Sequence, residues 1–137
     1  MKIEIKLNED DYQKLLKISS YAKQSKESYA ESIIKKDLEN NIYLEYGYIY
    51  DLNKKALMSN NNLIVLTNIE EQLLEYLIRN KDRYLSSNEI IENIFRTKPM
   101  SIFAMRNVIK KLRDKTHKDL IIVKSNVGYM IKIFYFF

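Results

Sequence analysis

The sequence is poor in several residue types that carry chemistry or allow tight turns. Its 137 residues include no cysteine, one histidine, two glycines and one proline. The absence of cysteine excludes disulfides and thiolate metal sites, and His117, in the polar run KTHKD, is expected to be a solvated loop residue. No carboxylate cluster has the spacing of metal ligands, and two glycines are too few for a phosphate-binding loop. We therefore expect no metal and no cofactor.

Long apolar segments are also missing. No apolar run approaches the roughly 20 residues of a membrane span, and the N-terminal MKIEIKLNEDD lacks the apolar region of a secretory signal. We expect a cytoplasmic protein with no membrane partner. The sequence also offers no plausible pair of nucleophile and base, so it is not expected to be an enzyme.

Positive charge is concentrated in the last third of the chain. Residues 1–41 hold eight Lys and Arg against eight acids, residues 42–95 five against eight, and residues 96–137 ten against two. A surface that is merely solvated would carry mixed signs along the chain. The uneven distribution instead indicates an anionic partner for the last third.

The first 41 residues begin with a strand-like segment. Apolar and charged residues alternate strictly over residues 2–7, which predicts a strand with Ile3, Ile5 and Leu7 on its buried face. Two helices should follow, one capped by Asn8 and one starting near Glu27. The second helix is predicted to bury the apolar side chains Tyr29, Ala30, Ile33, Ile34 and Leu38.

This short segment cannot cover its own strand. Two short helices are too little for the apolar face, and a lone strand leaves an open edge. A second copy of the same strand would solve both problems, so we expect a homodimer through residues 1–41.

Residues 42–131 have a different pattern, in which short strands are followed by helices and a hairpin. Strand-like runs separated by turns fill residues 42–66. Capping boxes at 67–70 and 86–89 then start two helices, and Pro99 with Ser101 marks the start of a third. Two strands joined at 125–128 close the pattern, with Gly128 suited to a positive φ.

The third of these helices contains the run RNVIKKLRDK. Ile102, Met105, Ile109 and Leu112 recur at helical spacing and are predicted to face the core. The cations Arg106, Lys110 and Arg113 should then share one exposed ridge, with Asn107 and Lys111 in the adjacent row. Most such runs are solvated faces, and Arg113 could instead pair with the acid-rich earlier helices.

Several motifs of this region occur together in a known order. LIVLTNIEEQLLEYL, LSSNEIIENIF, RNVIKKLRDK and VKSNVGYMI follow one another, and with them residues 42–131 resemble the OmpR/PhoB-type DNA-binding domain of bacterial response regulators. The resemblance implies an α+β winged helix-turn-helix with an N-terminal antiparallel sheet, three helices and a C-terminal hairpin wing. It implies double-stranded DNA as partner, with RNA polymerase as a further candidate partner.

The resemblance also implies roles for individual residues. It makes the helix at about 101–115 the recognition helix in the major groove. Arg106 and Asn107 are predicted to contact base edges, whereas Lys110, Lys111 and Arg113 contact phosphates. In the wing we expect contacts from Lys124, Ser125 and Asn126; Ser125 stands where the family usually has an arginine.

The N-terminal residues resemble a ribbon-helix-helix unit. That family forms dimers through paired strands, which here gives Ile3, Ile5 and Leu7 to dimerisation and makes Lys2, Glu4 and Lys6 candidate DNA contacts. The expected organisation is a dimerisation domain at 1–41 and a DNA-binding domain at 42–137. Forty-one residues are too few for a receiver domain, so control by aspartyl phosphate within this chain is not expected.

Two functions from different classes therefore follow. The first is a sequence-specific transcription regulator that binds double-stranded DNA as a homodimer. The alternative is a protein-interaction module, antitoxin-like or a docking winged helix, with no specific DNA site.

Overall fold

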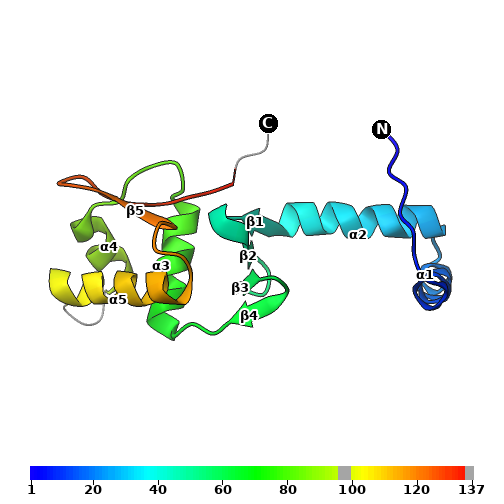
Figure 1. Ribbon diagram of the computed structural model, residues 1–137, viewed down its shortest axis with the longest axis horizontal. Coiled ribbons are helices and arrows are strands. Elements are labelled where there is room, and N and C mark those ends of the chain that lie inside the picture. Colours follow the sequence, from blue (N-terminus) through cyan, green and yellow to red (C-terminus); the bar gives the residue numbers. More distant parts are fainter. Residues whose placement is uncertain (96–99, 135–137) are drawn as a thin grey trace. The chain divides into compact units, whose positions relative to one another are not determined.

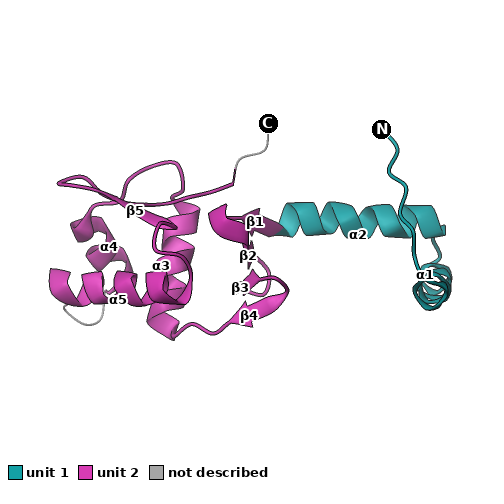
Figure 2. Ribbon diagram, viewed as in Figure 1, with its two compact units in different colours: residues 1–40 teal, residues 41–137 magenta. Residues whose placement is uncertain are grey.

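The computed structural model describes residues 1–95 and 100–134. The chain forms two compact units, residues 1–40 and residues 41–137 (Figure 2). Within the described residues, no helix has both the length and the apolar character that crossing a membrane requires.

The first unit consists of two helices, as the sequence predicts. α1 spans Glu9–Tyr21 and α2 spans Lys26–Asn40. The Asn8 side chain accepts a hydrogen bond from the Asp11 backbone N–H at 2.8 Å, so the predicted N-cap of α1 is confirmed.

The strand predicted over residues 2–7 is not formed in this single chain. Residues 1–8 have no regular secondary structure, and Ile3, Ile5 and Leu7 are 73%, 60% and 45% exposed. A strand is stabilised by hydrogen bonds to a neighbouring strand, and the unit contains no second strand among its described residues. The predicted ribbon is therefore not shown by one copy of the chain.

The burial predicted for α2 is wrong for three of its five apolar residues, while Tyr29 and Ala30 are half-buried. Ile33, Ile34 and Leu38 are exposed, and Ser19 of α1 is the one buried residue among those described in this unit. Two helices alone leave most of each helix surface uncovered. The first unit therefore has no hydrophobic core of its own.

The second unit opens with a four-stranded antiparallel sheet whose strands follow chain order (Figure 1). Its elements are β1 Asn41–Tyr43, the 3-10 turn η1 Glu45–Gly47, β2 Tyr48–Asp51, β3 Ala56–Ser59 and β4 Asn62–Ile64. Short turns join consecutive strands, so each strand pairs with its neighbour in sequence. The strands predicted between 42 and 66 are confirmed.

Three helices and a hairpin follow, which confirms the predicted winged-helix layout. They are α3 Asn68–Arg79, α4 Ser87–Ile94, α5 Ile102–Lys115, β5 Ile121–Lys124 and β6 Gly128–Ile131. Thr67 and Glu70 form the predicted capping box of α3, and the hydroxyls of Ser86 and Ser101 cap α4 and α5. Pro99 lies outside the described residues.

One hydrophobic core joins these elements. α3 contacts α4, α5 and β6. The core is made mainly of leucine and isoleucine, and its fully buried members include Leu57, Leu73, Leu74, Leu77, Leu85, Ile90, Met105, Ile109, Leu112, Leu120, Ile121 and Ile131.

Two isolated bridges attach the C-terminal hairpin to the rest of the unit. Leu85, before α4, bridges Tyr129, and Leu44, after β1, bridges Ile133. His117 is half-buried rather than solvated as predicted, because its ring stacks on Tyr46 with the centroids 3.7 Å apart. The hairpin is thus held against both the helices and the sheet.

Candidate nucleic-acid interface

α5 has one buried and one exposed face. Met105, Val108, Ile109 and Leu112 are buried, whereas the exposed polar and charged side chains include Arg106, Asn107, Lys110 and Lys111. Three members of the predicted apolar stripe are confirmed, but Ile102 is 40% exposed. Ile102 is the first residue of the helix and is not among the apolar residues that form the core or pack against it.

Arg113 is placed differently from the other cations of α5. Its Nε and Nη2 donate to the Ile121 carbonyl oxygen at 3.1 and 2.6 Å, and the residue is half-buried. The alternative pairing with an acidic helix is therefore not adopted. Arg113 ties α5 to β5, and its phosphate contact stays a prediction.

An ion pair between an exposed lysine and a buried carboxylate fixes the C-terminal end of α5. Lys115 Nζ donates to Glu70 Oε2 at 2.6 Å, and Glu70 is 2% exposed. Burial acts to raise the pKa of Glu70, but hydrogen bonds from Lys115 and from the Thr67 backbone N–H outweigh it and lower the pKa below its usual value. The carboxylate is therefore charged at neutral pH and holds α5 against the start of α3.

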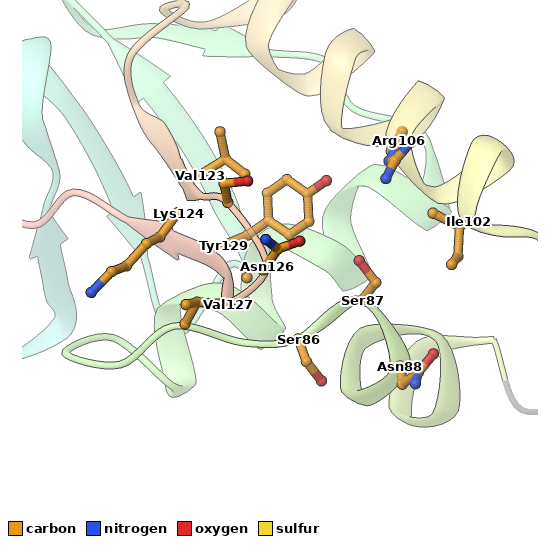
Figure 3. A pocket seen from close by; sticks show the side chains of 12 residues that line it. Ser86, Ser87, Asn88, Ile102, Arg106, Val123, Lys124, Asn126, Val127 and Tyr129 are labelled. Atoms are coloured by element: carbon orange, nitrogen blue, oxygen red, sulfur yellow. The ribbon is translucent and has the colours of Figure 1, made fainter.

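The N-terminal half of α5 borders an open hollow of about 820 Å³ (Figure 3). Its lining comes from the start of α4 (residues 86–88), from Ile102 and Arg106 of α5, and from residues 123–129 of the hairpin. Of the predicted site residues, Arg106, Lys124, Ser125 and Asn126 thus meet at one hollow. Asn107, Lys110, Lys111 and Arg113 are not part of its lining.

The tip of the hairpin presents its side chains to solvent. Lys124, Ser125 and Asn126 are exposed, and Asn126 has a φ of +62° in the turn closed by the Val127 N–H and the Lys124 carbonyl. Lys124 Nζ lies 5.8 Å from the centroid of the Tyr84 ring. In Figure 3 the Lys124 side chain points away from Arg106.

The N-terminal site residues belong to the other unit. Lys2, Glu4 and Lys6 are exposed, as are Ile3, Ile5 and Leu7, so both faces of the predicted strand are open. Their DNA contacts and their part in dimerisation stay predictions.

The structure adds an aromatic residue that the sequence analysis did not select. Phe103, in the first turn of α5, is 79% exposed, and the Arg106 guanidinium carbon lies 6.0 Å from its ring centroid. The helical spacing could have found it, because Phe103 stands three residues before Arg106 and four before Asn107. The residues 86–88 at the start of α4 were likewise not predicted to border the site.

Metal ligands do not gather anywhere in the parts of the chain that the structure describes. No group of three or more His, Asp or Glu side chains there could hold an ion. The hollow is lined by uncharged polar side chains, by apolar side chains and by the two cations Arg106 and Lys124.

Part of the chain is similar in sequence to known proteins. Residues 60–131 match the family described as "Transcriptional regulatory protein, C terminal". The transcriptional regulatory protein QseB of Haemophilus influenzae is 36% identical over 86 residues, which are 62% of this chain and 39% of QseB.

Solved structures show the same fold. The response regulator DrrB of Thermotoga maritima, an OmpR/PhoB homologue, has a TM-score of 0.59 at 21% identity over 72% of this chain and 49% of its own. The DNA-binding domain of Klebsiella pneumoniae RstA, solved in complex with the RstA box, has a TM-score of 0.57 at 17% identity and covers 67% of this chain and 96% of that domain. The chain spans less than half the length of QseB and DrrB.

Proposed function

The chain belongs to the family of transcriptional regulatory protein C-terminal domains, and we propose that it is a transcription regulator that binds specific sites on double-stranded DNA. This is a family of regulators rather than of enzymes. A regulator of this kind would act in the cytoplasm, and RNA polymerase would be a further partner.

The observation that carries the proposal is the exposed face of α5 beside the hairpin. Arg106, Asn107, Lys110 and Lys111 are all exposed on one helix, and the start of that helix borders the hollow with the wing. The major groove of B-DNA, about 12 Å wide, admits an α-helix. A helix inserted along this face would bring its cations to the bases and to the flanking phosphates.

The proposed roles follow from position along the helix. Arg106 and Asn107, nearer its N-terminus, would read guanine and adenine edges by paired hydrogen bonds. Lys110 and Lys111, one turn later, would contact phosphates, as would Arg113. The exposed wing residues Lys124, Ser125 and Asn126 would contact the backbone or the minor groove beside the helix.

The first unit supports a homodimer. Ile3, Ile5 and Leu7 are exposed in a unit that has no apolar core of its own, and α2 adds exposed apolar side chains. Pairing residues 2–7 of two copies as a ribbon would give each strand a hydrogen-bonding neighbour and would cover the apolar face. Lys2, Glu4 and Lys6 would then lie on the outer face, where they are candidate DNA contacts.

Salt dependence of binding tests the proposal. The full chain would be titrated with a duplex site selected from genomic fragments and with a scrambled duplex, at several salt concentrations. If each subunit contacts roughly four phosphates, the logarithm of the association constant should fall with log[salt] with a slope of about −7 for a dimer. Absence of DNA binding at low salt, or a flat dependence, would overturn it and favour the protein-interaction module.

A further inference from the structure

A highly exposed aromatic side chain lies among the polar side chains of α5. Phe103 is 79% exposed in the first turn of the helix. Arg106, Asn107 and Lys110 follow it at three, four and seven residues, which is the spacing of one helix face. Phe103 therefore belongs to the surface proposed to enter the major groove and not to the core.

The aromatic ring is paired with a cation. The Arg106 guanidinium carbon lies 6.0 Å from the Phe103 ring centroid, within the range of a cation–π contact. Phe103 and Arg106 are therefore neighbours on the exposed surface of α5 and would meet adjacent parts of one bound ligand.

We propose that Phe103 is a specificity-determining residue that contacts the C5-methyl group of a thymine in the major groove, beside the guanine read by Arg106. The inference rests on the proposed function. The thymine methyl is the apolar feature of the major groove, and Phe can contact it. Because Phe103 has no polar side-chain atom, it cannot read a base edge by hydrogen bonding.

The distance between the two residues limits which bases they can read together. Residues three apart on a helix have Cβ atoms about 5–6 Å apart, whereas bases on one strand follow each other every 3.4 Å or so. The thymine should therefore lie within about two base steps of the guanine. The specific site is expected to contain a thymine, on either strand, within about two base steps of this guanine.

Removing single methyl groups from the DNA tests this contact directly. Each thymine of the selected site would be replaced in turn by deoxyuridine, which keeps the base pair and deletes the methyl. The wild-type chain should lose about fourfold in affinity at one position per half-site, the size expected for one buried methyl group. Phe103→Ala should bind the unmodified site about as weakly as wild type binds the modified one, and should be indifferent to deoxyuridine.

A matched control separates this contact from a general effect of surface apolarity. Val65→Ala removes another exposed apolar side chain, 76% exposed, that lies between β4 and α3 and not on α5, and it should keep the wild-type response to deoxyuridine. If deoxyuridine reduced the affinity of wild type and of Phe103→Ala equally, the inference would be overturned, although the proposal of duplex binding would stand. So would a change of oligomeric state in Phe103→Ala without any deoxyuridine effect, since the ring would then contact a second copy. Failure of the wild type to bind any duplex would overturn the proposed function itself.

Discussion

At the scale of single residues, the two glycines have opposite surroundings. Gly47 has a φ of +81° and no heavy atom within 4 Å of where a Cβ would stand. Gly128 has a φ of +152°, and a Cβ there would lie 2.1 Å from the Leu85 carbonyl oxygen. Gly128 is therefore needed both for its backbone angle and for the close approach of the hairpin to the segment before α4.

Gly128→Ala should destabilise the second unit by about 3 kcal/mol, because backbone strain and overpacking act together. Gly47→Ala is the matched control and should cost only about 1 kcal/mol, the penalty of a positive φ alone. Urea unfolding followed by circular dichroism would measure both. Similar losses in the two variants would contradict the role given to the Leu85 contact.

Residue roles on α5 separate base reading from phosphate contact. Arg106→Ala and Asn107→Ala should lose about 1–3 kcal/mol on the selected site and little on scrambled DNA. Lys110→Ala and Lys111→Ala should weaken both kinds of DNA similarly, and each substitution should reduce the salt slope by about one unit per subunit. All four side chains are exposed, so the melting temperature should stay nearly unchanged. Quantitative gel shifts would measure these affinities. If all four variants lost the same affinity for the selected site and for scrambled DNA, α5 would contact only phosphates.

At the scale of elements, two polar contacts hold α5 in place. Lys115 reaches Glu70 at the start of α3, and Arg113 reaches the Ile121 carbonyl of β5. Both lie in the last turn of α5, while its first turns carry the proposed base contacts. The helix is thus anchored at its C-terminal end and presents its N-terminal end to the hollow.

The ion pair makes stability depend on pH. The folded-state pKa of Glu70 is below its ordinary value of 4.5, so the carboxylate stabilises the fold above that pH and this contribution is lost as the pH falls through the folded-state pKa. Glu70→Gln should cost about 1–3 kcal/mol at pH 7. The difference from wild type should shrink as the pH falls below about 4.5.

Thermal or urea unfolding of both proteins between pH 3 and 7 would follow this change. Glu71→Gln, at the next and exposed position, is the control and should leave stability nearly unchanged. If the difference in free energy of unfolding between wild type and Glu70→Gln stayed constant down to pH 3, the ion pair would not be its cause.

At the scale of the whole molecule, the two units differ in how they are stabilised. The second unit has a continuous core of buried leucine and isoleucine, whereas the first has exposed apolar residues on both helices and on residues 2–7. Structure in the first unit therefore depends on what covers those side chains. Mutations in the second unit should therefore change its free energy of folding, whereas mutations in the first unit should change how strongly two copies associate.

Ile5→Lys should convert a dimer into a monomer, because it places a charge on the face proposed to be buried between ribbons. Light scattering of the full chain at micromolar concentration would measure the mass. Glu4→Lys introduces the same side chain one residue earlier, on the outer face, and should leave the dimer intact. A wild-type chain that is monomeric under these conditions would refute the ribbon.

Sequence reasoning succeeded where local signals and a core agree. The N-caps Asn8, Thr67, Ser86 and Ser101 can all be predicted from the sequence, because each is a side chain with an oxygen acceptor placed just before apolar residues at helical spacing. The buried residues of α5 followed from their spacing, apart from Ile102.

It failed where burial depends on contacts outside the local sequence. Periodicity predicted burial for Ile33, Ile34 and Leu38, yet nothing described within the first unit covers them. The exposure of Phe103 depends on how much of the first turn of α5 the rest of the unit covers, which its spacing to Arg106 does not show. The stacking of His117 on Tyr46 joins segments that no sequence pattern connects.

The bridge between Leu44 and Ile133 has a consequence for synthesis on the ribosome. The β1–β4 sheet needs only neighbouring strands, so it can form as soon as its residues emerge. The edge of this sheet formed by β1 stays open until Ile133 and Phe134 have been synthesised. The Phe134 N–H then donates to the Tyr43 carbonyl at 2.8 Å. At roughly 5–20 residues per second, the nascent chain carries an unpaired edge for on the order of 10 s. In that interval it is a target for chaperones and for pairing with neighbouring nascent chains.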